Sequence, residues 1–431
     1  MFETLRNAWK IEDLRKKLIY TMLVLLVVRI GSAIPVPFID PSFLKAMVDS
    51  TGNLLGYLDM LTGGAFSQAT LFALSISPYI TASIVIQLLT VAIPALERLA
   101  KEGQEGQERL KKITRYTTVA LAVLQAVAYY TMFRRTPGAV AYTDGAYGVL
   151  AALSIIGAFT AGAMLVVWLG ERIDDKGIGN GISLILFAGI VSRIPASIGD
   201  MIKLMIEQKG IMFLWVPLIA VIFLAEIAFI VLMNNAERRI PVQYAKRVVG
   251  RKMYGGQSSF MPIKVNMSGV LPVIFASTFL AIPGTIGGFL NLNPAEHPYW
   301  TAFFNMFSYR SIFYAVLYFL LIIGFNYFYI AIQYNPIEMA NNLRKNNGAI
   351  PGIRPGKPTS DFITKVISKI TLVGALMLAA IAILPIIITA VTGMNVALGG
   401  TSIIIIVGVA LDTVRSLESQ MMMRHYKGFL E

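Results

Sequence analysis

The sequence predicts an all-α polytopic membrane protein with ten transmembrane helices in two five-helix halves. The first observation is composition: 56% of the 431 residues are hydrophobic and only 14% are charged, whereas soluble proteins carry about 25% charged residues. The second is that apolar runs of roughly 18 or more residues, long enough to span a bilayer, recur along the whole chain. The third is that basic residues gather in alternate connections between these runs.

Ten spans follow from the apolar runs, over 18–36, 70–94, 115–133, 147–169, 182–199, 211–235, 268–290, 311–334, 366–390 and 399–417. The fifth is the weakest, because Arg193 and Pro195 shorten its apolar run. An even number of spans puts both termini on one side, which carries most of the 37 basic residues. The positive-inside rule therefore predicts that both termini are cytoplasmic.

The spans divide the chain at about residue 200. We expect an N-terminal half over 18–199 with spans one to five, and a C-terminal half over 200–417 with spans six to ten. Because each half has an odd number of spans, the second is inverted relative to the first. Residues 1–17 are amphipathic and basic, which predicts a cytoplasmic helix lying against anionic lipid. No small-residue cleavage site follows the first span, so we expect no removable signal peptide, and residues 418–431 form a cytoplasmic tail.

Two long basic loops lie on the cytoplasmic side of the C-terminal half, over about 236–265 and 335–365. A simple connection needs only a handful of residues. The length and charge of the first loop therefore predict that it docks a large anionic partner. In the second loop, prolines and glycines stiffen a tip that presents Arg354. This tip is either a recognition element or ordinary positive-inside charge.

Each half contains a helix that glycine or proline interrupts. Residues 54–60 are apolar but too short to span, and Gly63 and Gly64 separate them from the second span. In the seventh span, the interruption comes from Pro283 and the glycines that follow it. Breaks at membrane depth are tolerated where the backbone is buried in protein or lines a cavity. They indicate a central pathway, with packing kinks as the alternative, and the short 54–60 element is either a plug or a re-entrant packing element.

Catalytic and metal chemistry finds no support in the sequence. There is no cysteine, which excludes disulfides and thiolate metal sites, and the two histidines, His297 and His425, lie on opposite sides. No catalytic triad, paired-carboxylate or metal-ligand spacing occurs. The glycines at 177, 179 and 181 lack the lysine of a phosphate-binding loop, so they predict a tight cytoplasmic turn. We expect neither an enzyme nor a cofactor.

Two further polar features lie in spans. Glu226 is near the middle of the sixth span, where a charge costs on the order of 3 kcal/mol. We expect it to be protonated or bonded to a neighbouring helix, and a structural or partner-helix contact is favoured over a proton relay. Asp412 and Arg415, three residues apart near the inner end of the last span, are predicted to form a local pair.

Five separated segments, in order along the chain, resemble motifs of the SecY family, the channel subunits of the bacterial protein translocase. The resemblance covers essentially the whole chain. The segments read GGAFSQATLFALSISPYITASIVIQLLT, GERIDDKGIGNGIS, AKRVVGRKMYGGQSSFMPIKVNMSGVLPVIFAS, NPIEMANNLRKNNGAIPGIRPGKPT and GGTSIIIIVGVALD.

The resemblance implies that the two inverted halves surround a central hourglass pore. A ring of branched aliphatic side chains would close the pore, since such a ring can exclude ions and still yield to a passing chain. The implied ring is Ile80, Ile84, Ile182, Leu186, Ile274 and Ile405. The implied plug covers about 56–67, with Gly56, Leu58, Leu61, Gly63, Gly64, Phe66 and Ser67. The implied lateral gate has spans two and three on one side and spans seven and eight on the other. The gate residues at this seam would be Gln87, Thr90 and Asn266.

The resemblance also implies partners for the basic loops, namely the ribosome through its RNA and the motor ATPase SecA. The docking residues would be Arg238, Arg239, Lys246, Arg247, Arg251, Lys252, Arg344, Lys345, Arg354 and Lys357. SecE and SecG would be accessory subunits, with signal peptides and nascent polypeptides as substrates. The function expected is a channel of the bacterial inner membrane that translocates unfolded polypeptides and releases transmembrane segments into lipid. The alternative is a secondary transporter, but the midplane offers one lone carboxylate rather than a coordinating cluster.

Overall fold

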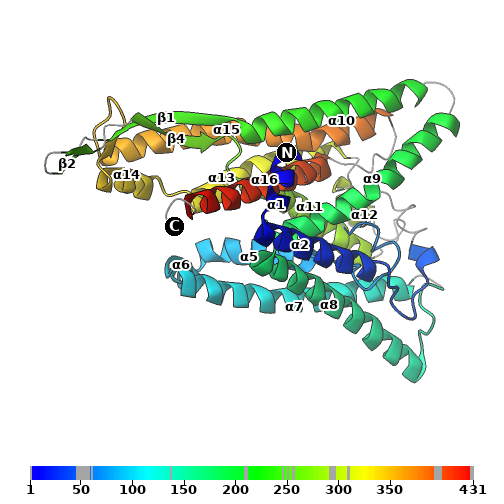
Figure 1. Ribbon diagram of the computed structural model, residues 1–431. Helices are drawn as coiled ribbons and strands as arrows, with labels where there is room; N and C mark the ends of the chain where they lie inside the picture. Colours follow the sequence, from blue (N-terminus) through cyan, green and yellow to red (C-terminus); the bar gives the residue numbers. More distant parts are fainter. Residues whose placement is uncertain are drawn as a thin grey trace.

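The computed structural model describes residues 2–44, 59, 62–135, 138–207, 212–244, 247–249, 252–254, 258–290, 298–307, 311–392 and 400–427. Within these residues a long helix coincides with each of the ten predicted spans (Figure 1). These helices are α2 (Glu12–Gly31), α5 (Ser77–Ala92), α7 (Gln104–Arg135), α8 (Gly145–Lys176), α9 (Gly181–Glu207), α10 (Met212–Asn235), α11 (Leu271–Leu290), α13 (Ile312–Gln333), α15 (Lys357–Thr392) and α16 (Gly400–Lys427). In the described part of the chain, six helical segments are long and apolar enough to cross a membrane. The chain is a helical multi-pass membrane protein.

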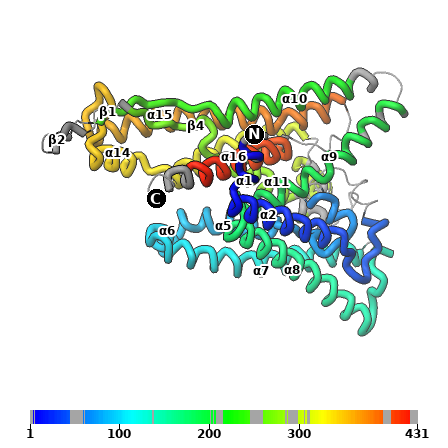
Figure 2. Tube along the Cα trace, viewed as in Figure 1, coloured from blue at the N-terminus to red at the C-terminus, as the bar shows by residue number. Residues whose placement is uncertain are grey.

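The helices form two groups that follow chain order. Figure 2 shows α2, α5, α7 and α8 on one side and α10, α13, α15 and α16 on the other. In the first group α5 packs on α7, α7 on α8, and α8 on both α2 and α9. In the second, α13 packs on α11 and α15, while α16 packs on α10 and α15. The groups meet where α9 contacts α10 and α16.

Small residues let neighbouring helices approach closely. Ala122 and Ala126 on α7 and Ala163 on α8 are completely buried, as are Ala375 and Ala379 on α15. Lipid tails are as apolar as leucine, so the association of membrane helices depends on close van der Waals packing rather than on the hydrophobic effect. These alanines supply the flat surfaces that such packing needs.

The second span differs from its prediction at both ends. Residues 62–76 form successive turns instead of helix, and α5 begins only at Ser77. Pro78 lies in the first turn of α5, where its missing N–H would have no helical partner in any case. After α5, the helix α6 (Pro94–Lys101) starts at a proline and bends away by 102°. The helix of the second span is therefore shorter than the predicted range 70–94.

The seventh span is not interrupted. The helix α11 continues through Pro283 to Leu290, although sequence analysis predicts a break there. Membrane helices tolerate proline because small local adjustments satisfy the freed backbone groups. The helix α12 (Pro298–Met306) follows it.

The chain ends are helical and pack together. The helix α1 (Phe2–Lys10) stops at Lys10, so the single helix expected over 1–17 is wrong. The helix α16 continues through the first ten residues of the predicted tail, to Lys427. Ala8 of α1 and Leu417 of α16 are buried in one cluster. Thr4 donates to Glu418 and Lys17 to Gln420, so these ends are joined by polar contacts as well.

A small β-structure protrudes at one end of the molecule, beside α14 (Pro336–Lys345) (Figure 1). Its strands are β1 (Glu237–Tyr244), β2 (Arg247–Val249), β3 (Lys252–Tyr254), β4 (Ser258–Lys264) and β5 (Gly348–Ala349). The order β4-β1-β5 makes a three-stranded antiparallel sheet, and β2 pairs with β3. The prediction of an all-α protein omits these strands.

Several local predictions are confirmed. Residues 177–180 form the tight turn between α8 and α9, with Gly179 at φ +77°. Asp412 and Arg415 form an ion pair at 3.8 Å. Glu226 is 5% exposed, inside the bundle, but neither of its carboxylate oxygens has a hydrogen-bond partner. Of the two expected alternatives, a protonated side chain or one bonded to a neighbouring helix, the described residues show no such bond, and a contact with a partner helix stays a prediction.

Candidate functional site: a closed central cavity and a basic platform

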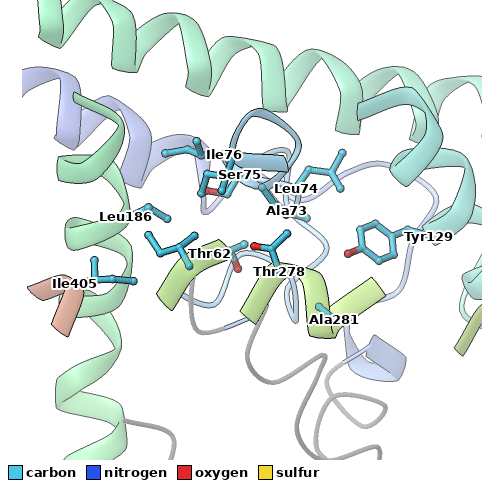
Figure 3. A pocket seen from close by; sticks show the side chains of 13 residues that line it. Thr62, Ala73, Leu74, Ser75, Ile76, Tyr129, Leu186, Thr278, Ala281 and Ile405 are labelled. Carbon is cyan, nitrogen blue, oxygen red and sulfur yellow. The ribbon is translucent and has the colours of Figure 1, made fainter. Parts of the chain in front are cut away.

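A narrow cavity lies where four helices from both groups converge. Branched aliphatic side chains line it from α5, α9, α11 and α16, and residues of the 62–76 turns close another side (Figure 3). The aliphatic residues are Ile80, Leu186, Ile274 and Ile405. The cavity measures about 60 Å³, which is room for only a few water molecules. An apolar constriction of this size opposes the passage of hydrated ions.

Four of the six predicted ring residues therefore line this cavity, and two do not. Ile182 is partly buried in the same apolar cluster, but its side chain lies against Gly170 of α8, 3.1 Å from where a Cβ would be. Ile84 is 8% exposed and one turn along α5 from Ile80. Neither Ile182 nor Ile84 is part of the cavity wall.

Other cavity residues were missed by sequence reasoning. They are Thr62, Ala73, Leu74, Ser75, Ile76, Ser77, Tyr129, Thr278 and Ala281. Figure 3 shows Tyr129 on the side of the cavity formed by α7. Its ring contacts Phe66 edge-on, with centroids 5.2 Å apart. Tyr129 and Phe133 are four residues apart on one face of α7, so helical periodicity was the available signal.

The predicted plug is only partly within the described residues. Gly56, Leu58 and Leu61 lie outside them. Gly63 and Gly64 adopt positive φ angles of +68° and +89°, which glycine adopts without strain. Phe66 and Ser67 are buried beyond this turn.

Asp59 holds this turn together. Its backbone carbonyl accepts hydrogen bonds from the Gly64 N–H at 2.8 Å and from the Thr62 hydroxyl at 3.0 Å. Its carboxylate accepts from the Ser67 N–H at 2.7 Å and forms an ion pair with Arg193 of α9. The residue that weakened the fifth span in the sequence is therefore paired with a buried carboxylate.

In the described part of the chain, neither Gln87 nor Thr90 of α5 forms a hydrogen bond with Asn266. Asn266 donates its side-chain N–H to the Asn234 Oδ1 at 2.7 Å, and its own Oδ1 is buried without a hydrogen-bond partner. Thr90 donates to the Gln87 carbonyl on its own helix at 2.6 Å. Among these described residues, Asn266 thus has an unsatisfied acceptor, and the Thr90 hydroxyl bonds within α5.

The two basic loops form one structural unit. The register pairs Gln243 with Ala349 and Tyr244 with Gly348, which joins β1 of the first loop to β5 of the second. Beneath the sheet, Ile240, Ile263 and residues of α13, α14 and α15 share one apolar cluster. We call this unit, β1 to β4 together with 335–365, the basic platform. Nothing in the sequence indicates that the two loops pair with each other.

Exposed cations cover the platform. Arg238, Arg344, Lys345, Arg354 and Lys357 are all exposed. Arg239 is committed to the sheet, since it pairs with Glu237 at 2.7 Å and lies over the Phe260 ring at 4.8 Å. Arg247 and Lys252 lie in strands β2 and β3, while Lys246 and Arg251 are outside the described residues.

The tip that carries Arg354 is ordered by its own backbone. The Arg354 carbonyl accepts from the Thr359 hydroxyl at 2.8 Å, and Gly352 and Gly356 supply positive φ angles on either side. The Ser360 N–H donates to the Gly356 carbonyl at 3.1 Å, in the first turn of α15. The guanidinium is thus presented from a fixed turn rather than from a mobile loop.

A family model described as SecY matches residues 70–414. The chain belongs to the SecY family. It is 42% identical to the protein translocase subunit SecY of Streptomyces scabiei over 447 aligned residues, which cover all of both chains. It is 40% identical to the subunit of Thermotoga maritima over 441 residues, covering all of this chain and 98% of the relative.

Solved structures of similar fold agree with this membership. A protein-conducting channel superimposes with a TM-score of 0.66 at 19% identity, covering 94% of this chain and 92% of the other. Sec61 in the canine ribosome-channel complex superimposes with a TM-score of 0.62 at 18% identity, again covering 94% of this chain and 92% of the other. As a SecY family member the chain is a protein-conducting translocation channel, and the transporter alternative is not supported.

Proposed function

We propose that the chain conducts unfolded polypeptides across the bacterial inner membrane through the cavity lined by Ile80, Leu186, Ile274 and Ile405. The observation that carries the proposal is the convergence of branched aliphatics from four helices on one narrow cavity. Branched side chains can repack around an extended chain at small cost, while an empty apolar constriction excludes ions. Ile84 and Ile182 support this ring from the second layer of side chains.

The turns of residues 62–69 serve as the described part of a plug. The segment lies against the cavity through Thr62 and packs Phe66 on Tyr129. A translocating chain has to displace it, because the cavity offers only about 60 Å³ in this state.

Transmembrane segments of the substrate leave the channel sideways into lipid through a seam. One side of the seam is formed by α5 and α7, and the other by α11 and α13. Asn266 lies just before α11, and its unsatisfied buried acceptor is available to a donor such as Gln87 or Thr90 when the two groups approach. An interhelical hydrogen bond of this kind is worth about 1 kcal/mol. An apolar signal peptide entering the seam competes readily with so small an energy.

The basic platform docks the driving partner, either SecA or the ribosome. Its exposed cations favour an anionic surface such as ribosomal RNA, for which electrostatic contacts to phosphates provide most of the affinity. Sec61 adopts this fold in a ribosome-channel complex, which supports the same use here. The end of the molecule that carries the platform faces the cytoplasm, as do both termini. SecE and SecG are the accessory subunits that complete the channel. Anionic lipid binds the basic face of α1.

The test is transport by the channel complex in proteoliposomes, driven by the motor ATPase and measured as protease-protected precursor polypeptide. Wild-type vesicles should protect precursor well above vesicles without the channel, and equal protection in the two would overturn the proposal. Arg354→Glu reverses the charge on an ordered tip, so we expect uptake to fall about tenfold, equivalent to about 1.4 kcal/mol of lost coupling.

The matched control is Lys203→Glu, which reverses an exposed charge on α9, away from the platform. Its uptake should stay close to that of the wild type. Equal uptake by the Arg354→Glu and Lys203→Glu variants would remove Arg354 from the docking role.

A further inference from the structure

An ion pair with a buried carboxylate joins the predicted plug to α9. Asp59 is 1% exposed, and its carboxylate is paired with the Arg193 guanidinium across 134 residues of sequence. Taking a carboxylate out of water is unfavourable unless it is paired and its lone pairs are satisfied. Here Oδ2 accepts from Arg193 and Oδ1 accepts from the Ser67 N–H at 2.7 Å.

The same residue also shapes the turn, so the ion pair and the turn conformation depend on each other. The Asp59 carbonyl accepts from the Gly64 N–H at 2.8 Å, and the Ser67 hydroxyl donates to the Gly64 carbonyl at 3.2 Å. If the turn opened, Asp59 would lose its partner at Ser67 and its position opposite Arg193. Conversely, without Arg193 the carboxylate would be buried with an uncompensated charge.

The turn packs closely against α9 and α2 at Gly63. A Cβ on Gly63 would lie 2.8 Å from the Gly189 carbonyl and 2.9 Å from the Ser192 hydroxyl of α9. From α2, Arg29 donates to the Gly63 carbonyl at 3.4 Å. The turn is thus held by two cations from two helices, Arg193 of α9 and Arg29 of α2.

We propose that Asp59 and Arg193 form an electrostatic latch that holds the 62–69 turns against the cavity, and that a passing polypeptide opens the channel by breaking it. Arg193 is a positioning residue for the plug, and Arg29 is an auxiliary contact. The proposal rests on the proposed function, because it assigns a closing device to the same cavity. It explains why an arginine stands within an otherwise apolar fifth span.

The latch can be tested by the accessibility of a buried reporter. The chain has no cysteine, so Ala65→Cys, at a position 1% exposed beside the latch, introduces a single thiol. In the complete channel complex in vesicles, the alkylation rate of this thiol by a water-soluble maleimide measures how often the turn leaves its site. All variants carry the same reporter.

Arg193→Gln and Asp59→Asn should each raise the alkylation rate about tenfold, and Lys203→Gln, an exposed charge on the same helix, should leave it unchanged. Asparagine retains an oxygen for the Ser67 N–H, so this variant removes the charge and keeps the turn acceptor. Because the two residues act as one unit, the alkylation rate of the double variant should also rise about tenfold. Two independent sites would instead raise the rate about a hundredfold. A rate within twofold of the Lys203→Gln control, or additive effects, would overturn the latch.

Ion leakage through the resting channel separates this proposal from the proposed function. Removal of residues 56–67 is the reference for an absent plug. If that deletion leaks and Arg193→Gln leaves alkylation unchanged, the latch is wrong and the plug stands. If Arg193→Gln raises the alkylation rate, but neither Arg193→Gln nor the deletion of residues 56–67 raises ion leakage, the latch stands and the sealing role of the plug is wrong.

Discussion

Replacing Gly374 with alanine is expected to displace the segment that leads from the basic platform into α11. A Cβ at this position of α15 would lie 2.4 Å from the Val265 carbonyl oxygen, about 1 Å inside normal contact distance. The obstructing atom belongs to the backbone, so Val265 itself has to move. Its N–H donates to the Ala236 carbonyl at 2.9 Å, and the next residue, Asn266, donates to Asn234 at 2.7 Å. A shift of about 1 Å takes both bonds to the limit of hydrogen bonding.

The size of the effect follows from three contributions. Overpacking costs about 1–3 kcal/mol, and each weakened hydrogen bond costs up to about 1 kcal/mol. The better helix propensity of alanine returns about 1 kcal/mol. The net loss of stability is therefore about 0–4 kcal/mol, and at the middle of this range, about 2 kcal/mol, we expect a thermal midpoint about 4 °C lower in lipid nanodiscs.

The matched control is Gly324→Ala on the neighbouring helix α13, where a Cβ meets nothing within 4 Å. This variant should be neutral or slightly more stable than the wild type. The assay is thermal unfolding followed by circular dichroism, together with precursor uptake, which should fall only for Gly374→Ala. Equal midpoints for the two variants would refute the claim that Val265 cannot yield.

Two smaller predictions concern single side chains that accept hydrogen bonds from the backbone. Thr21→Val removes the hydroxyl that accepts from the buried Ile178 N–H at 3.2 Å, so it should cost about 1–2 kcal/mol in thermal unfolding, whereas Thr21→Ser should retain most of that stability. Hydrogen bonds from the Ser42 hydroxyl and then from its N–H hold the pKa of Asp40 below its ordinary value. The stabilisation is therefore present above about pH 4 and is lost as pH falls through the lowered pKa. Asp40→Ala should lower the thermal midpoint at pH 7 more than at pH 3, and a pH-independent difference would contradict this.

The positions of the spanning helices were predictable because each is a long apolar run, and no other spanning structure satisfies its backbone groups within one segment. The strands were partly predictable. Ile240 and Val242 are the buried residues of β1 and alternate with exposed ones, which is the period of a strand. This alternation is short and lies among the many basic residues of the loop, so it is difficult to recognise from the sequence.

The cavity and the latch show where prediction from one sequence stops. The ring residues came from motif resemblance, and the position of Ile182 against Gly170 rather than in the cavity wall is a matter of three-dimensional packing. Asp59 and Arg193 are 134 residues apart, and no periodicity relates them. Pairing of this kind is fixed only when the helices have assembled.

The pairing of β1 with β5 constrains how the two basic loops can diverge among relatives. A Cβ on Gly348 would lie 2.9 Å from the Tyr244 ring, so a larger residue at 348 requires a smaller or differently oriented one at 244. The contact joins positions about a hundred residues apart that no shared helix connects. Substitutions at these two positions should therefore be inherited together, and the loops should exchange between family members only as a matched set.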